Sequence, residues 1–387
     1  MIFLDNNATT RMDERVRDAM LPFFCETYGN PSGPYRFARR AGNAVEKARE
    51  YVAGAVGVSA EAVAFTSGGT EANNTIIHAA LAARPERRRI LVSAVEHASV
   101  LEPCAAWARR GYDVVRLPVD QDGCLIDRVW NETLDDRVAL VCLMGANNES
   151  GVCFDISARA AQAHAVGALF HSDITQCIGK VPIKLGEDGA DYAALSAHKI
   201  HGPKGVGAMI LPRHSEAWLS FQQGGDQEKG RRPGTLNVPG IVGLGEAVRL
   251  IDASNGPAMA ELRDEMEKGF METIPHLRVL GRASRRLPNT SLLHIAGVDA
   301  EAILARLDEA HICCSSGSAC MAGSAEPSHV VEAMGLAGRA RYEVIRMTLS
   351  RFTNDAELAM VRGILPTVVG QIRDVMRSLV TSDKGEA

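Results

Sequence analysis

The chain has 387 residues, 46% of them hydrophobic and 23% charged, as is typical of a soluble globular protein with about two domains. Lys and Arg (42) nearly balance Asp and Glu (47), giving a formal net charge of −5, so no basic surface is expected for nucleic acid or an anionic membrane. The sequence has no long uncharged apolar run, no secretory signal pattern and no CxxC pair among its nine cysteines, so we expect a cytoplasmic enzyme with reduced thiols.

Short apolar runs alternate with longer amphipathic segments through the first two thirds of the chain, which is typical of strands joined by helical crossovers. The predicted helices include 70–83 and 100–110. Because the strands are continuous apolar runs, they should be buried on both faces, which favours a mainly parallel sheet. The predicted strands of this α/β part are 62–66, 89–95, 113–117, 138–144, 168–171, 192–196 and 206–211.

The pattern changes at Asn255-Gly256-Pro257, and such Gly-Pro punctuation is typical of a domain boundary. We predict a large α/β domain over residues 12–255 and a smaller α+β domain over 256–387, with residues 1–11 as an arm that packs with the small domain. The elements predicted after the boundary are a helix at 258–273, strands at 278–280, 291–294 and 344–349, and a helix from 355.

Two segments of the α/β part carry groups that can bind a ligand. Residues 66–71 (TSGGTE) lie between a predicted strand and a helix, where glycines and unpaired helix N–H groups form an anion site suited to a phosphate. The alternative is a plain strand–turn–helix joint with Thr70 as the cap. Asp173 follows another predicted strand, at the sheet edge where α/β proteins bind ligands; the alternative is a helix N-cap.

Lys199 follows directly on a strand that is predicted to be buried. A lysine there is costly unless it is paired or chemically used, and a partly desolvated lysine can form a Schiff base with an aldehyde. The alternative is a solvated loop lysine, which we expect for Lys204. Pyridoxal phosphate needs three groups: an anion site for its phosphate, a carboxylate for its ring nitrogen and an amine for its aldehyde. Gly69 and Thr70, Asp173 and Lys199 supply one of each, in that order.

Cys320 lies in a run of small residues, 315–324, which predicts an exposed and flexible loop. Structural cysteines are usually buried among apolar neighbours, whereas an exposed thiol in such a loop can act as a nucleophile and carry the product away. The alternative, a surface cysteine without a role, is disfavoured because exposed thiols are a liability. Cys313 and Cys314 are predicted to be core strand residues. The other cysteines lack metal-ligand spacing and are assigned to packing: Cys25, Cys104, Cys124, Cys142, Cys153 and Cys177.

These segments resemble the cysteine desulfurases, pyridoxal-phosphate enzymes of the class V aminotransferase family, and among them the NifS/IscS group. The resemblance runs nearly end to end, and its most specific part is SAHKIHGPKG at 196–205 together with SSGSAC at 315–320. It implies fold type I of the pyridoxal-phosphate transferases, a mainly parallel sheet in a large domain with a smaller α+β domain. The other matching segments are LDNNATT (4–10), YGNPS (28–32), TSGGTEANN (66–74), EHASV (96–100), ANNESG (146–151), RRPGTLN (231–237), EPSHV (326–330) and IRMTLSRFT (345–353).

The resemblance implies removal of sulfur from L-cysteine, which gives L-alanine and a persulfide on Cys320. It further implies that Lys199 binds pyridoxal phosphate and moves protons, that His97 stacks on the ring and assists, and that Asn148 and Arg346 bind the substrate carboxylate. The residues it assigns to the cofactor are Gly69, Thr70, His97, Asn148, Asp173, Gln176, Ser196, His198, Lys199 and Thr235, the last from the other subunit of a homodimer.

An iron–sulfur scaffold or another acceptor protein is the implied partner, and the NifS-like pattern favours a supply for nitrogenase or another dedicated cluster. It stays open whether Cys320 transiently ligates iron through its persulfide. The sequence departs from the family pattern at 32–35 (SGPY) and at Met321. The alternatives are a selenocysteine lyase or an aminotransferase of the same fold, or a metal carrier, which would leave Lys199 and Asp173 unexplained.

Overall fold

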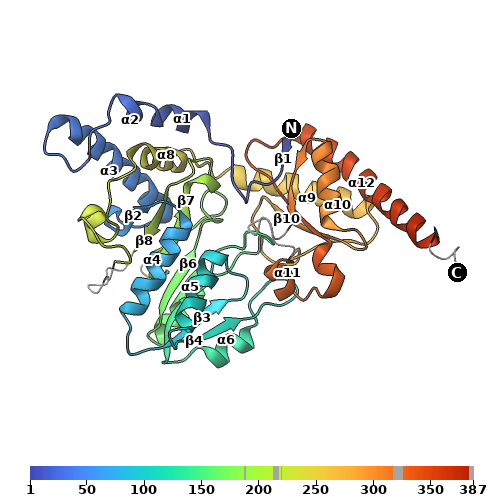
Figure 1. Cartoon of the computed structure of the whole chain (residues 1–387), viewed down its shortest axis with the longest axis horizontal. Coiled ribbons are helices and arrows are strands. Elements are labelled where there is room, and N and C mark those ends of the chain that lie inside the picture. The colour runs from blue at the N-terminus through green and yellow to red at the C-terminus, as the bar shows by residue number, and fades with distance from the viewer. Residues whose placement is uncertain (187–188, 212–217, 219, 317–325, 383–387) are drawn as a thin grey trace.

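The chain's structure, a computed structural model, describes residues 1–186, 189–211, 218, 220–316 and 326–382. Within them, seven strands form the largest sheet (Figure 1). These strands are β2 (Val63–Thr66), β3 (Arg89–Ser93), β4 (Asp113–Leu117), β5 (Val138–Cys142), β6 (Leu169–Asp173), β7 (Tyr192–Ser196) and β8 (Gly207–Ile210). Each predicted strand of the α/β part overlaps one of them.

The strands of this sheet follow the spatial order β2-β8-β7-β6-β5-β3-β4. The run from β7 to β4 is parallel throughout, which confirms the predicted mainly parallel sheet. Strand β8 is antiparallel to both of its neighbours, β2 and β7. Its direction follows from its connection, because residues 197–206 are too few for a parallel crossover, which needs about a dozen or more.

Helices cover both faces of the sheet because alternate strand residues are apolar on both sides (Figure 1). On one face, α4 (Gly69–Ala82) packs across β7 and β8, with α5 (Ala98–Ala108) beside it. On the other face, α3 (Arg36–Val56) and α1 (Glu14–Met20) pack against α8 (Val238–Arg249). The remaining helices of this part are α2 (Pro22–Cys25), α6 (Asp127–Thr133) and α7 (Ile156–Ala165), with short 3-10 turns η1 (Ala60–Ala62), η2 (Ala197–Lys199) and η3 (Gln227–Gly230).

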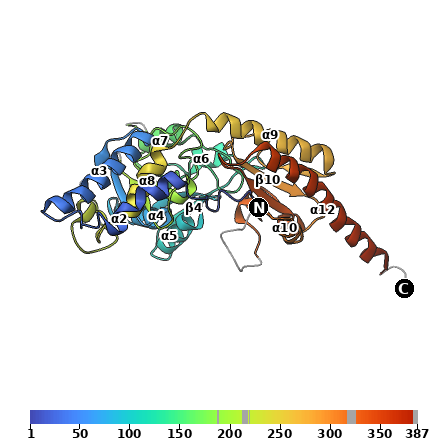
Figure 2. The same cartoon turned by 90° about the horizontal axis from the view of Figure 1, so that it is seen from above.

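The C-terminal part has its own antiparallel sheet of four strands in the order β12-β13-β10-β9, and its own apolar core. Figure 2 shows α9 and α12 side by side along this part, and the two helices are in contact. None of the described helices has the length and apolar character that crossing a membrane requires. The elements are β9 (Leu277–Val279), β10 (Thr290–Ile295), β12 (Ser315–Ser316), β13 (Val344–Thr348), α9 (Asn255–Thr273), α10 (Ala300–Glu309), α11 (His329–Ala333), η4 (Gly338–Tyr342) and α12 (Asp355–Ser382).

The first residues of the chain join the two parts. Strand β1 (Ile2–Phe3) pairs in parallel with β11 (Ile312–Cys313) of the C-terminal part. The chain then crosses to the large sheet, where the Thr10 N–H donates to the carbonyl of His198 at 2.9 Å. The N-terminal arm therefore contacts both parts, whereas the prediction gave it only the small one. The predicted domain boundaries themselves stay predictions.

The cysteines outside the 315–324 segment do not all behave as predicted. Cys104, Cys142 and Cys177 are buried, in agreement with a packing role. That assignment is wrong for Cys25 and Cys124, which are exposed. Cys25 ends α2, a single short turn with no buried residue, and the thiol of Cys124 contacts the Ser284 hydroxyl at 3.2 Å in an exposed turn.

The two adjacent cysteines near the Cys320 segment are half-buried. Cys313 ends β11 as predicted, but Cys314 lies between β11 and β12, where it packs against the core of the C-terminal part. Cys320 and Met321 lie outside the described residues. Among the residues that are described, no group of three or more His, Cys, Asp or Glu could hold a metal ion.

Candidate active site

A cavity of about 240 Å³ lies at the carboxyl ends of β5, β6 and β7, where open α/β sheets bind ligands. Nine of the twelve predicted site residues line it. They are Gly69, Thr70, His97, Asn148, Asp173, Gln176, Ser196, His198 and Lys199. The lining residues that the sequence did not predict are Ala8, Ser99, Met144, Ala146 and Thr175.

The first turn of α4 forms one wall of this cavity. Gly68 precedes the helix with φ 156° and ψ −178°, a conformation that is essentially restricted to glycine. No side chain caps the helix, and Thr70 is inside its first turn, so the alternative that Thr70 is the cap is wrong. The Thr175 hydroxyl is buried without a hydrogen-bond partner, and Ser196 also lines the cavity. This set of N–H and hydroxyl donors suits an anion such as a phosphate.

Asp173 ends β6 and is buried. Its Oδ1 accepts from the Thr175 N–H at 2.9 Å and its Oδ2 from the Asn73 amide at 2.8 Å. The other end of the Asn73 amide faces Nε2 of His171 at 2.9 Å, and burial lowers the pKa of His171 to about 4, which keeps that ring neutral. Asp173 therefore closes a turn and does not cap a helix. Its carboxylate is held by a series of hydrogen-bonded side chains that the sequence reasoning did not identify.

His97 connects to the same series of hydrogen-bonded side chains from the other side of the cavity. It is the N-cap of α5, and its Nδ1 accepts from the Ser99 N–H at 3.1 Å. The Ser99 hydroxyl lies 2.8 Å from that Nδ1 and accepts from the Asn73 amide at 2.9 Å. Because Nδ1 accepts a backbone N–H, a neutral His97 carries its proton on Nε2.

Lys199 ends η2, directly after β7. Its ammonium donates to the carbonyls of Asn7 and Ala8 at 2.5 and 2.7 Å. Next to it, burial and the charge of Lys199 lower the pKa of His198 to about 4, and Nδ1 of His198 lies 3.1 Å from the Thr9 hydroxyl. The N-terminal arm thus forms part of the site around Lys199.

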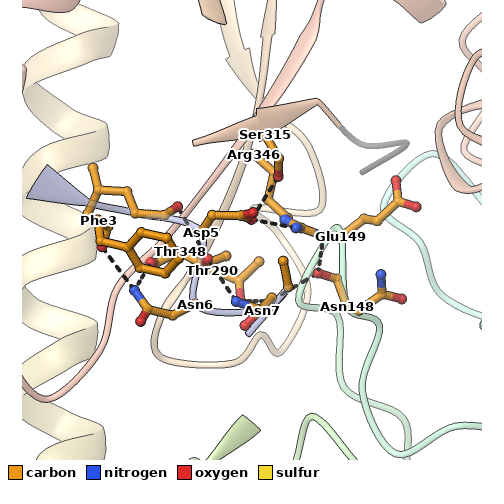
Figure 3. A network of polar contacts seen from close by, with 12 residues as sticks. Phe3, Asp5, Asn6, Asn7, Asn148, Glu149, Thr290, Ser315, Arg346 and Thr348 are labelled. Atoms are coloured by element: carbon orange, nitrogen blue, oxygen red, sulfur yellow. Dashed lines mark hydrogen bonds and ion pairs between the residues drawn. The ribbon is translucent and has the colours of Figure 1, made fainter. Parts of the chain in front are cut away.

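Arg346 lies beside the cavity, on β13 of the C-terminal part, and is 1% exposed. Figure 3 shows its guanidinium between two groups: Nη2 donates to the Asp5 carboxylate at 2.7 Å and Nη1 to the Asn148 carbonyl at 3.1 Å. Its Nε is buried and has no hydrogen-bond partner among the described residues. The Ser315 hydroxyl also donates to Asp5, at 2.9 Å.

Thr235 is a predicted site residue that does not line the cavity. Thr235 is exposed, in the segment between η3 and α8, so its predicted role in the partner's site stays a prediction. Its neighbour Arg232 pairs with Glu71 of α4 at 2.7 Å. Cys320 lies in a segment that the structure leaves undescribed.

Comparison with known proteins identifies the family. The aminotransferase class-V family model matches residues 2–361. A curated cysteine desulfurase of Cereibacter sphaeroides is 47% identical over 96% of each chain, and the cysteine desulfurase NifS of Azotobacter vinelandii is 42% identical over 97% of this chain and 94% of its own. The chain belongs to the class-V aminotransferases, among the cysteine desulfurases. A solved structure of a NifS-like protein superposes with a TM-score of 0.88 at 31% identity, covering 95% of this chain and 99% of that one.

Membership of this family confirms the resemblance that the motifs indicated, and with it the predicted fold class and enzyme class. The roles of individual residues are inferred from their positions at the cavity. The residues missed by the sequence reasoning, Asn7, Asn73 and His171, act on the predicted ones through hydrogen bonds. Asn7 lies within the LDNNATT segment, Asn73 within TSGGTEANN and His171 two residues before Asp173, so a signal was present for all three.

Proposed function

We propose that this cysteine desulfurase holds pyridoxal phosphate in the cavity at the ends of β5, β6 and β7, and that Cys320 takes sulfur from L-cysteine. The observation that carries the proposal is the meeting of Lys199, Asp173 and the uncapped start of α4 in one cavity. A phosphate fits the first turn of α4 beside the unpartnered Thr175 hydroxyl. A ring nitrogen that carries a proton fits the buried, hydrogen-bonded carboxylate of Asp173.

When bound, pyridoxal phosphate supplies an aldehyde that captures amines and a ring that withdraws electrons from the substrate Cα. The protein supplies the rest. Lys199, held at the end of β7 by two carbonyl groups, provides the amine and then moves the proton at Cα. His97 lines the same cavity and assists that transfer through Nε2. Asp173 keeps the ring nitrogen protonated, because Asn73 and Thr175 hold its carboxylate in place.

The substrate carboxylate is assigned to Asn148 and Arg346. Arg346 is buried and its Nε has no partner, so a carboxylate there gains a charge-assisted hydrogen bond. Asp5 and the Asn148 carbonyl fix the other two nitrogens and so fix the plane of the guanidinium.

The overall reaction joins the substrate sulfur to Cys320. The Cys320 thiolate attacks the sulfur of L-cysteine, an S–S bond forms as the C–S bond breaks, and protonation of the carbon skeleton yields L-alanine. The persulfide on Cys320 then passes to an iron–sulfur scaffold or another acceptor in the cytoplasm, including one that serves nitrogenase. We also propose a homodimer in which Thr235 completes the phosphate site of the partner.

The deciding experiment reduces the holoenzyme with borohydride, digests it and weighs the peptides. We expect the cofactor on Lys199, and a loss of desulfurase activity of at least about 100-fold in Lys199→Ala. Lys268→Ala, which alters an exposed lysine of α9, is the control and should retain wild-type turnover. An unmodified Lys199 peptide from protein saturated with pyridoxal phosphate would overturn the proposal.

Cys320→Ala tests the sulfur acceptor and the alternative reactions. This variant should bind the cofactor as the wild type does but release no alanine from L-cysteine. Full turnover in Cys320→Ala, with an α-keto acid receiving the amino group, would instead indicate an aminotransferase. Much faster turnover of selenocysteine than of cysteine by the wild type would indicate a selenocysteine lyase.

A further inference from the structure

Lys180 is a second lysine beside the site, and the proposed reaction does not use it. It is half-buried in the segment after β6. Its Nζ donates to Oε1 of Gln176 at 2.5 Å and to Oδ1 of Asn7 at 3.1 Å. It lines a small hollow of about 40 Å³ together with Lys199, while Gln176 lines the active-site cavity itself.

The bond from Lys180 decides which end of the Gln176 amide faces which way. An ammonium group has three donors and no acceptor, so the end of Gln176 that faces Lys180 must be the oxygen. The amide nitrogen is then at the opposite end, and it donates to the Asn7 carbonyl at 3.0 Å. Lys199 donates to that same carbonyl oxygen at 2.5 Å, so Gln176 and Lys199 meet at one atom of the N-terminal arm.

Lys180 also fixes Asn7 itself. Oδ1 of Asn7 accepts from Lys180 and from the Asn289 amide at 3.0 Å. This leaves the Asn7 amide nitrogen to donate to the Asn148 carbonyl at 3.0 Å. Lys180 therefore orients Gln176 and, together with Asn289, orients Asn7, and the groups of these two residues surround Lys199 and Asn148.

We propose that Lys180 is a positioning residue for the reaction at Lys199: it makes Gln176 present an N–H, and not a carbonyl, to the cofactor, and it holds Asn7 where the amine of Lys199 is bound. The inference rests on the proposed function, because it requires a cofactor oxygen opposite Gln176. Without Lys180 the amide can rotate and turn its carbonyl toward the cavity, where it would repel any oxygen that the cofactor presents. The loss of a donor and the gain of a repulsive contact should weaken cofactor binding.

The charge of Lys180 acts in the same direction as its hydrogen bonds. The charged and titratable groups that act on it are Lys199 and Arg346, both cationic, and the thiols of Cys177 and Cys153. Burial, with the charge of Lys199 next, lowers the pKa of Lys180 to about 7, so Lys180 acts as an ammonium group below about pH 7 and loses this charge as the pH rises further. A cation near Lys199 favours its unprotonated form, so removing Lys180 should make protons bind more tightly at Lys199.

The test compares Lys180→Met with the wild type as holoenzymes. We expect the cofactor still on Lys199 after borohydride reduction, a cofactor Kd raised at least about ten-fold, and the pH midpoint of the cofactor absorbance moved upward. The kcat for cysteine should fall as well. Lys184→Met, an exposed lysine four residues further along the same segment, is the matched control and should match the wild type in every readout.

A second pair of variants separates positioning from a general loss of structure. Lys180→Gln keeps a hydrogen-bond donor and should restore part of the cofactor affinity. In a Gln176→Met background, the further change Lys180→Met should raise the cofactor Kd by a smaller factor than it does in the wild type, because the part of its effect that passes through Gln176 is gone. The same comparison can be made with Lys180→Gln if Lys180→Met does not fold.

Wild-type cofactor affinity and an unshifted absorbance titration in Lys180→Met would overturn the inference. So would equal losses in the presence and absence of Gln176, since Lys180 would then act by another route. Failure of the proposed function looks different, because in that case the wild type itself would carry no cofactor on Lys199.

Discussion

At the scale of single residues, the groups assigned to chemistry are oriented by polar neighbours one contact further from the cavity. Asn73 joins His97, through Ser99, to Asp173. Each of these groups is buried or lies at a helix end, so each lost hydrogen bond would leave an unpaired polar atom. Such losses cost about 1–3 kcal/mol each. These hydrogen bonds therefore hold Asp173 in its orientation whether or not a ligand is bound.

Glu149 gives a residue-scale prediction for stability against pH. It is buried beside Asn148, accepts from the Ser328 hydroxyl at 2.5 Å, and burial raises its pKa to about 7. Between its ordinary pKa near 4.5 and pH 7, the folded chain binds more protons than the unfolded chain, so the contribution of Glu149 is lost as pH rises. Glu149→Gln removes this pH-dependent loss of stability, because its amide stays neutral and can still accept the hydrogen bond from Ser328.

We expect the free energy of unfolding of Glu149→Gln, relative to wild type, to rise by about 2–3 kcal/mol between pH 5 and pH 8. Urea denaturation at both pH values measures it. Glu272→Gln, at an exposed position of α9, should show no such change. A difference between Glu149→Gln and wild type that is equal at both pH values would contradict the assignment.

The sequence located the residues that the ligand would touch but not those that orient them. Gly69, Asp173 and Lys199 could be predicted because each follows or precedes a strand, and parallel strands end at one edge. The roles of Asn73 and Lys180 could not, although Asn73 lies within the TSGGTEANN segment, since these roles arise only when segments distant in sequence meet, as Asn73 does with Asp173 across 100 residues. The exposure of Cys25 was missed because a short turn without buried residues has no periodicity to read.

At the scale of elements, the anion site depends on how closely β8 approaches the start of α4. Gly207 of β8 pairs with Thr66 and Ser196 on its two sides. A Cβ at Gly207 would lie 2.5 Å from the Leu195 carbonyl oxygen and 2.7 Å from Cα of Gly68. Both contacts are with backbone, so no side chain can move aside. The antiparallel direction of β8, which the apolar pattern alone did not specify, is what creates this contact.

Gly207→Ala should therefore damage stability and the anion site together. The backbone has to shift by several tenths of an ångström at Gly68, and overpacking of this kind costs about 1–3 kcal/mol. We expect that loss in urea denaturation and a cofactor affinity at least about ten-fold lower. The control is Gly54→Ala in the last turn of α3, where nothing lies within 4 Å of the added Cβ, and it should be neutral or stabilise by up to about 1 kcal/mol. Unchanged cofactor binding in Gly207→Ala would contradict this prediction, because it would show that the connection between β2 and α4 tolerates the backbone shift.

At the scale of the whole molecule, the N-terminal arm connects the two sheets through Asn7. Its amide donates to Asn148 on the side of the large sheet and to the Thr290 hydroxyl of β10, at 2.9 Å, on the other. Its Oδ1 likewise accepts from Lys180 on one side and from Asn289 on the other. Asn7, which belongs by sequence to neither sheet, thus ties both of them together next to Ala8, the arm residue that lines the cavity.

Asn7→Ala should uncouple the unfolding of the two parts. The variant loses side-chain hydrogen bonds to both, at about 1 kcal/mol each, so we expect about 2–4 kcal/mol less stability and transitions that no longer coincide between probes. Trp107, Trp130 and Trp218 all lie before residue 255, so tryptophan fluorescence reports the large-sheet part, while far-UV circular dichroism reports both. The control is Asn6→Ala: within the described part of the chain, the Asn6 amide donates to the carbonyls of Phe3 and Thr348 alone, so its loss should lower stability without separating the two signals. Coincident transitions in Asn7→Ala at wild-type stability would mean that other contacts, such as the Arg346 bonds to Asp5 and Asn148, suffice to hold the two parts together.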